Sequence, residues 1–307
     1  MGILNNKPIL VTGSHRSGST WIGKMLALPS NVVYIHEPFN LHHRPDICKA
    51  RFEYWFTYIC DQNEFLYLHD LKHTLNFKYS LSEELKAINS KKDFLRLLRD
   101  YVPFTEYRLF SRRPLVKDPI AIFSADWLAK KFDMDVITII RHPAAFAGSL
   151  KKANWPHPFD HFLKQPLLME HHLSKYSSII EEYSKQEKDI VDQAILLWNL
   201  IHHMISIYRE INPNWLFVRH EDISRDPIGE FRKLYYKLGL KFSKGIQKKI
   251  ESFSFANPNK EKDPLKRDSK SNIFQWKTRL SLDEIRKIKE NTLEVASKFY
   301  TEEDWGE

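Results

Sequence analysis

A short run of residues near the start of the chain has the composition of an anion-binding loop. Arg16 contributes a guanidinium group, Ser17, Ser19 and Thr20 contribute hydroxyl groups, and Gly18 lies between them. Such side chains donate hydrogen bonds to phosphate oxygens, and glycine lets backbone N–H groups approach an anion closely. We therefore expect a phosphate-bearing ligand at this loop.

The elements that must position this loop are a strand and a helix. Residues 9–11 are an apolar run that predicts a buried strand, and residues 21–26 follow a helical pattern. A helix N-terminus after a glycine-containing turn attracts an anion through its N–H groups and its dipole. Position 19 holds serine where a Walker A loop requires lysine, which disfavours ordinary ATP or GTP hydrolysis.

A second cationic site is predicted later in the chain. Residues 136–140 are the clearest buried strand, and Arg141 follows them directly. Pro143 suits the first turn of a helix, which would place Ser149 about two turns further on. Arg141 and Ser149 together can hold a second phosphate. A surface arginine and a helix-interior serine without a ligand remain an open alternative.

Charged residues also end two other predicted strands. Residues 32–35 lead into His36 and Glu37, and Pro38 keeps Glu37 extended at the end of its strand. Residues 114–117 predict another strand with Lys117 at its exit. Ligands of open α/β sheets bind at the carboxyl ends of the strands, so these side chains are candidates for a site.

These motifs carry a resemblance to a known family. Arg-Ser-Gly-Ser-Thr-Trp at residues 16–21 resembles the loop by which sulfotransferases hold the 5′-phosphosulfate of 3′-phosphoadenosine 5′-phosphosulfate (PAPS). Ile-Ile-Arg-His-Pro at residues 139–143, with Ser149 beyond, resembles their signature for the 3′-phosphate. Ser269, Lys270 and Ser271 ahead of Trp-Lys resemble the C-terminal phosphate loop, although the usual pattern there is Arg-Lys-Gly. The chain is similar to bacterial members, and to the carbohydrate and tyrosylprotein branches more than to the cytosolic aryl and steroid branch.

The resemblance assigns roles to individual residues. It implies that Arg16 contacts the phosphosulfate, that residues 17–20 form its cradle, and that Glu37 is the general base, with His36 as the alternative. Lys117 resembles a lysine that stabilises the transition state. Trp21 matches a position whose ring stacks on adenine, while a core tryptophan is an equally open interpretation.

The implied reaction is transfer of a sulfuryl group from PAPS to a hydroxyl of a glycan, a glycolipid or a phenolic compound. Such a transfer resembles phosphoryl transfer, in which cations stabilise the leaving group, and it requires no metal. His157 and His161 have a spacing seen in metal sites, but they lack nearby partner ligands, so we expect no metal. The rival hypotheses are a P-loop kinase or NTPase, and a non-catalytic nucleotide-binding protein.

Composition limits the setting of this chemistry. The net charge of +8 favours an anionic ligand, although we expect no nucleic-acid partner. Two cysteines, Cys48 and Cys60, indicate a reducing compartment, and no apolar run reaches the length of a membrane span. With no signal peptide recognised, we expect a cytoplasmic protein.

Strand and helix patterns alternate along the chain, which predicts an α/β class. The expected fold is a P-loop-like three-layer arrangement with a mainly parallel sheet of about five strands and a helical cap. We expect one domain over residues 1–307, with helical substrate-wall insertions at about 41–113 and 151–190. Helices are predicted, among others, at 51–60, 91–101, 120–132 and 189–211, with a capping box at Ser281 for the last helix.

Overall fold

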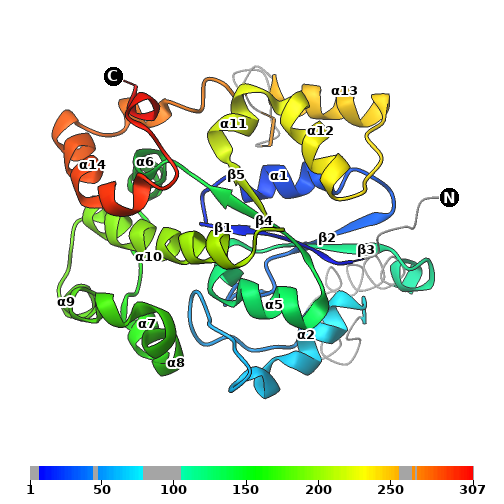
Figure 1. The fold of residues 1–307 in the computed structure, drawn as a ribbon, viewed down its shortest axis with the longest axis horizontal. Helices are drawn as coiled ribbons and strands as arrows, with labels where there is room; N and C mark the ends of the chain where they lie inside the picture. Colours follow the sequence, from blue (N-terminus) through cyan, green and yellow to red (C-terminus); the bar gives the residue numbers. More distant parts are fainter. Residues whose placement is uncertain (1–6, 44–47, 79–104, 256–264, 267, 307) are drawn as a thin grey trace, which may run out of the picture.

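The computed structural model describes residues 7–43, 48–78, 105–255, 265–266 and 268–306. Its centre is one parallel sheet of five strands in the order β2-β3-β1-β4-β5 (Figure 1). This confirms the predicted fold class. The strands are β1 (Ile9–Gly13), β2 (Val32–His36), β3 (Arg113–Lys117), β4 (Asp135–Ile140) and β5 (Leu216–Arg219).

The sheet is buried on both faces, as parallel sheets require. Successive residues of a strand point to opposite faces, and Leu10 packs in one hydrophobic cluster while Ile9 and Val11 pack in the other. Helices cover both faces, giving three layers (Figure 1). They are α1 (Ser19–Leu26), α2 (Leu68–Leu75), α5 (Ala125–Phe132), α6 (Pro143–Ala153), α7 (Asp160–Leu163), α8 (Pro166–Leu168), α9 (Ser177–Lys185), α10 (Ile190–Ile211), α11 (His220–Arg225), α12 (Pro227–Lys237), α13 (Lys244–Ser254) and α14 (Leu282–Ala296).

Local sequence signals set several helix ends. Ser281 caps α14 in a capping box with Glu284, as predicted, and Asp189 caps α10 by accepting from Val191 N at 2.7 Å. The expected helix at 120–132 is divided into a short 3-10 helix (Pro119–Ser124) and α5.

The prediction of a helix at 51–60 is wrong. This segment is irregular, and Phe56 has a φ of 59°. Its backbone N–H groups donate to side chains of other elements: Trp55 N to His161 Nδ1 at 3.0 Å, Tyr58 N to Gln165 Oε1 at 2.8 Å, and Ile59 N to Ser124 Oγ at 2.9 Å. Those tertiary contacts replace the hydrogen bonds that a helix would supply.

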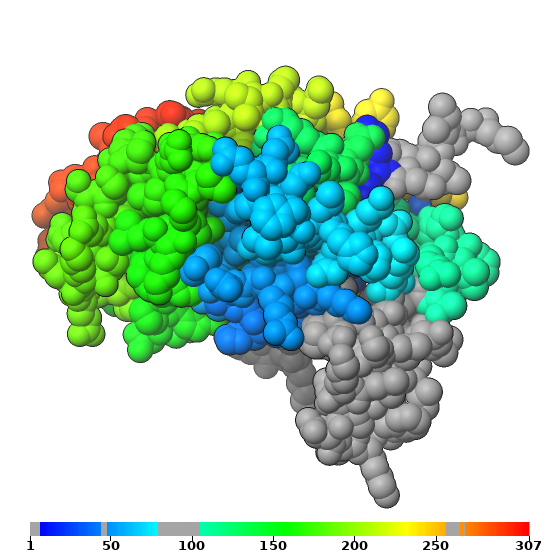
Figure 2. Space-filling model, turned by 90° about the horizontal axis from the view of Figure 1, so that it is seen from below, coloured from blue at the N-terminus to red at the C-terminus, as the bar shows by residue number. Residues whose placement is uncertain are grey.

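Residues 48–78 spread over one face of the molecule beside α7 to α9 (Figure 2). The predicted helix at 91–101 lies outside the described residues, and the division into one domain with two wall insertions stays a prediction.

Helix α10 is long and apolar enough, by length and composition, to cross a membrane, which the sequence analysis had not expected of any segment. However, 67% of its most apolar stretch is buried inside the protein. Burial of this kind is typical of a core helix.

Candidate active site

The strand register brings the predicted chemistry to one edge of the sheet. His36 pairs with Lys117 across β2 and β3, and Val11 pairs with Lys117 across β3 and β1. The loop after β1, the residue Glu37 after β2 and the exit of β3 are therefore neighbours. The carboxyl ends of these parallel strands form the place where a ligand of an open α/β sheet binds.

The loop between β1 and α1 has an unusual backbone. Gly18 has a φ of 85° and Arg16 a φ of 61°, both in the left-handed region. A Cβ atom on Gly18 would lie 2.5 Å from His220 Cδ2, so both the dihedral angle and the available space require glycine there. Gly18 is the N-cap of α1 and offers no capping side chain, so the first N–H groups of the helix are available to a bound anion.

The two predicted phosphate signatures meet at this loop. Arg16 Nε donates to Ser149 Oγ at 2.9 Å, and Ser149 is on α6. The guanidinium of Arg141 donates to the backbone carbonyl of Arg16. Two cationic side chains and the helix N-terminus therefore surround one volume, although their parent strands and helices are far apart in sequence.

Glu37 and Lys117 form an ion pair at the end of β2 and β3. Lys117 is 0% exposed, and Asn40 Nδ2 donates to the other carboxylate oxygen of Glu37 at 2.9 Å. Burial raises the pKa of Glu37, but the charge of Lys117 and the hydrogen bonds from Lys117 and Asn40 outweigh it, so the net pKa is lowered. Glu37 is thus a carboxylate at neutral pH.

The backbone holds this carboxylate in a strained conformation. Glu37 has a φ of 43°, and its N–H donates to the Lys117 carbonyl at 2.9 Å. Below it, the buried Asp118 accepts from Phe39 N at 2.7 Å and Ile120 N at 3.0 Å. Burial raises the pKa of Asp118 to about 7. Asp118 therefore fastens the loop after Glu37 to the segment after Lys117.

A cavity of about 600 Å³ opens between these elements. Such a volume is typical of small-molecule sites. Its lining combines the predicted residues with side chains from residues 40–56 and 155–158: His15, Arg16, Gly18, Ser19, Thr20, Trp21, Glu37, Asn40, Trp55, Phe56, Pro119, Ile120, Arg141, Trp155, Pro156, His157 and Pro158.

Trp21 lies in the core. Its side chain is 0% exposed, and its ring packs edge-on against Phe231 at 5.4 Å and near His220 at 6.3 Å. No ring face is open for stacking on adenine in this conformation, so the structure supports the core interpretation that the sequence left open.

The predicted residues of the C-terminal loop do not reach the cavity. Ser269 is 0% exposed and its hydroxyl donates to the Ser224 carbonyl at 3.0 Å. Ser271 Oγ donates to the Asp268 carbonyl at 3.1 Å, and Lys270 is exposed. Ser269 and Ser271 make local structural contacts here, so nucleotide binding by these three residues stays a prediction.

Sequence reasoning missed His15, Asn40 and the aromatic wall around Trp55. Asn40 had a usable signal, because it is three residues beyond Glu37. The wall had none, because residues 51–60 were expected to be helical. Among the described residues, no group of three or more His, Cys, Asp and Glu side chains could hold a metal ion.

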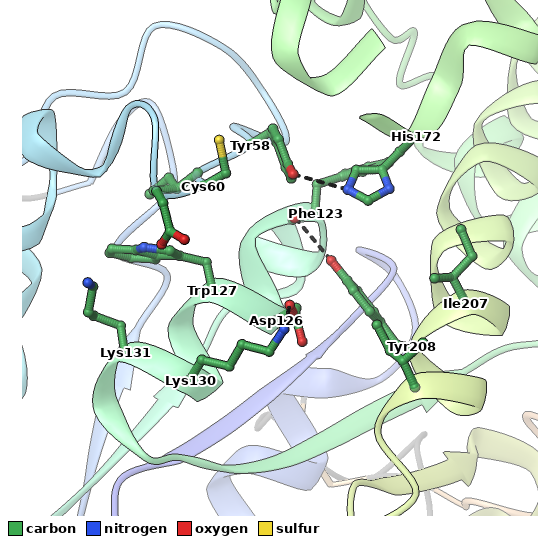
Figure 3. A pocket seen from close by; sticks show the side chains of 13 residues that line it. Tyr58, Cys60, Phe123, Asp126, Trp127, Lys130, Lys131, His172, Ile207 and Tyr208 are labelled. Atoms are coloured by element: carbon green, nitrogen blue, oxygen red, sulfur yellow. Dashed lines mark hydrogen bonds and ion pairs between the residues drawn. The ribbon is translucent and has the colours of Figure 1, made fainter. Parts of the chain in front are cut away.

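A second cavity of about 320 Å³ shares no lining residue with the first. It lies between α5, α10 and residues 58–61 (Figure 3). Tyr58 is hydrogen-bonded to His172 Nε2 at 3.1 Å, and Tyr208 donates to the Phe123 carbonyl at 3.0 Å. Its central polar groups are thus already paired, and none of the signature residues lies there.

A model described as the sulfotransferase family matches residues 8–244, which is well over half of the 307-residue chain. The chain belongs to the sulfotransferase family. This confirms the expected enzyme class, a PAPS-dependent sulfotransferase, over the alternative of a P-loop kinase or NTPase. A comparison with curated proteins gives no significant match.

Solved structures agree with the fold. The sulfotransferase domain from the curacin biosynthetic pathway has a TM-score of 0.53 and 14% identity, with 95% of this chain and 96% of that chain covered. A mouse sulfotransferase complexed with PAP has a TM-score of 0.47 and 12% identity, with 95% of this chain and 85% of that chain covered.

Proposed function

We propose that this sulfotransferase moves the sulfuryl group of PAPS to an acceptor hydroxyl, with Glu37 as general base. The observation that carries the proposal is the ion pair of Glu37 with buried Lys117 beside the loop of Arg16. A carboxylate that receives a proton, and cations that stabilise the leaving phosphate, are the two groups that this transfer needs.

The nucleotide half of the cavity fits a doubly phosphorylated ligand. Arg16, the residues 17–20 and the first N–H groups of α1 would hold the 5′-phosphosulfate. Arg141 and Ser149 would hold the 3′-phosphate. PAPS supplies the activated sulfuryl group, and the residues of this chain position it.

Lys117 explains how a carboxylate of low pKa can act as a base. In the resting site its charge is shared with Glu37. As negative charge develops on the transferring group, Lys117 would pair with that group and its hold on Glu37 would weaken. The proton affinity of Glu37 would then rise when the acceptor hydroxyl loses its proton, late in the reaction.

Two measurements test the proposal. Thermal shift should give larger stabilisation with PAP than with ATP and Mg²⁺, because only PAP has a 3′-phosphate for Arg141 and Ser149. Incubation with labelled PAPS and crude polar and lipid extracts should give labelled sulfated products. Binding of PAP without any labelled product would instead favour a non-catalytic nucleotide-binding protein. A cytoplasmic location stays a prediction.

A further inference from the structure

The cavity wall has two chemically different parts. One part contains Arg16 and Arg141 and belongs to the proposed nucleotide site. The other, here called the acceptor wall, consists of Asn40, Trp55, Phe56, Pro119, Ile120, Trp155, Pro156, His157 and Pro158. The inference below rests on the proposed function, because it concerns the acceptor of that reaction.

The acceptor wall carries no cation among the described residues that line the cavity. The charged lining residues are Arg16, Arg141 and Glu37. Arg141 donates to the Arg16 backbone and Arg16 donates to Ser149, while Glu37 is paired with Lys117. An acidic acceptor would lose hydration in this wall without gaining a counter-ion, which is costly. The net charge of +8 is therefore expressed elsewhere than on this wall.

Two histidines at the wall do not supply the missing charge. His15 packs against Phe146 at 5.2 Å and Phe56 at 5.7 Å, and His157 packs against Phe162 at 5.0 Å. Burial lowers the pKa of His15 to about 4, helped by the charge of Arg16, and burial lowers the pKa of His157 well below its usual value. Both rings are neutral at neutral pH.

A neutral imidazole has one donor and one acceptor nitrogen, which matches a hydroxyl better than an anion. One nitrogen of each ring, His15 Nδ1 and His157 Nε2, is buried without a hydrogen-bond partner. Such groups are uncommon in native proteins and point to a polar partner that binds nearby.

Aromatic faces complete the wall. Trp155 is 50% exposed, and the Arg16 guanidinium lies 5.1 Å from its ring centroid. Asn154, with a φ of 49°, ends α6 and turns the chain toward Trp155. Exposed indole rings pack on flat apolar or sugar rings.

We propose that the acceptor is an uncharged, ring-bearing alcohol, rather than an acidic glycan or a phosphate-bearing lipid. Its ring packs on Trp155 and the apolar wall residues. Its hydroxyl groups exchange hydrogen bonds with His15, His157 and Asn40, and one of them faces Glu37. A neutral sugar and an aromatic alcohol share this chemistry.

The test is a competition among acceptors. Crude extracts are supplemented with equimolar 2-naphthol, 6-hydroxy-2-naphthoate, phenyl β-D-glucoside and phenyl β-D-glucuronide, and incubated with the protein and labelled PAPS. Sulfated products are identified by mass spectrometry and sorted by the charge of the acceptor. We expect neutral acceptors to yield at least about tenfold more product than their anionic analogues. The naphthol and glucoside products separate aromatic from sugar acceptors.

A pair of variants tests the cause of the selectivity. Pro156 is exposed at the cavity rim, so Pro156→Lys adds a cation there without filling the core, and Pro156→Gln is the matched neutral control. Pro156→Lys should raise the share of anionic products about threefold or more, and Pro156→Gln should leave it unchanged.

Equal or preferred sulfation of the anionic acceptors by the wild-type protein would overturn the inference and leave the proposed function intact. The absence of every sulfated product, with PAP still bound, would overturn the proposed function and this inference together.

Discussion

The Nε atom of Arg16 donates a hydrogen bond to Ser149 Oγ at 2.9 Å, across 133 positions of the chain. The first residue belongs to the loop proposed for the 5′-phosphosulfate and the second to the site proposed for the 3′-phosphate. The two phosphate sites therefore share a boundary. Changes at Ser149 are expected to affect the end of the nucleotide that carries the 3′-phosphate.

Ser149→Ala should weaken PAP binding by about tenfold, the loss of one hydrogen bond to a charged group. AMP has no 3′-phosphate, so its affinity should change by less than about twofold. Calorimetric titration of both nucleotides into both proteins measures this difference. An equal loss for PAP and AMP would mean that Ser149 acts through the loop and not on the 3′-phosphate.

Gly18→Ala should destabilise the protein by about 1–2 kcal/mol in the free energy of unfolding, because of the positive φ and the close approach of His220. PAP binding should weaken as well, since the loop would have to move. Gly245→Ala is the matched control: its Cβ would have only Ser243 Oγ nearby, at 3.8 Å. That change, within α13, should be neutral or stabilising by up to about 1 kcal/mol in urea denaturation.

Asp118→Asn should cost about 1–3 kcal/mol in the free energy of unfolding. Both carboxylate oxygens of Asp118 accept from backbone N–H groups, and an amide would turn a donor toward one of them. Asp133→Asn, at an exposed position, should stay within about 0.5 kcal/mol of the wild type. Similar unfolding midpoints for the two variants would contradict the fastening role of Asp118.

The acid limb of the pH profile reports the base. The pKa of Glu37 is lowered, so kcat/KM for transfer should hold constant from neutral pH down to below about pH 5 and fall only where Glu37 gains a proton. Asn40→Ala removes a hydrogen bond to the carboxylate, which raises the pKa of Glu37 and moves the limb to higher pH.

His36→Gln is the control for that profile. His36 is the alternative base, and its removal should leave the limb in place. A wild-type limb near pH 6 that disappears in His36→Gln would assign the base to the histidine.

The strands and the two signature loops could be predicted because their signals are local. Residues 136–140 are β-branched and apolar, and Arg141 and Pro143 mark the strand end and the helix start within a few residues. Gly18 likewise marks a turn that only glycine fits. The place of Glu37 beside Lys117 followed from parallel strands that end at one edge.

The rest depended on contacts between distant segments. Residues 51–60 have a helical pattern, but His161, Gln165 and Ser124 accept their backbone hydrogen bonds. Ser269 resembles a phosphate ligand by position, yet its hydroxyl is bonded to Ser224. The neutral state of His15 arises from burial that no local pattern reveals.

The role of Glu37 is tested most directly by Glu37→Gln in a labelled sulfate transfer assay from PAPS. The amide keeps the shape of the side chain but cannot accept the hydroxyl proton, so kcat should fall by about 10²–10⁴-fold. PAP affinity should remain within about twofold, and the exposed control Glu294→Gln should match the wild type. Transfer by Glu37→Gln at the wild-type rate would contradict Glu37 as the general base.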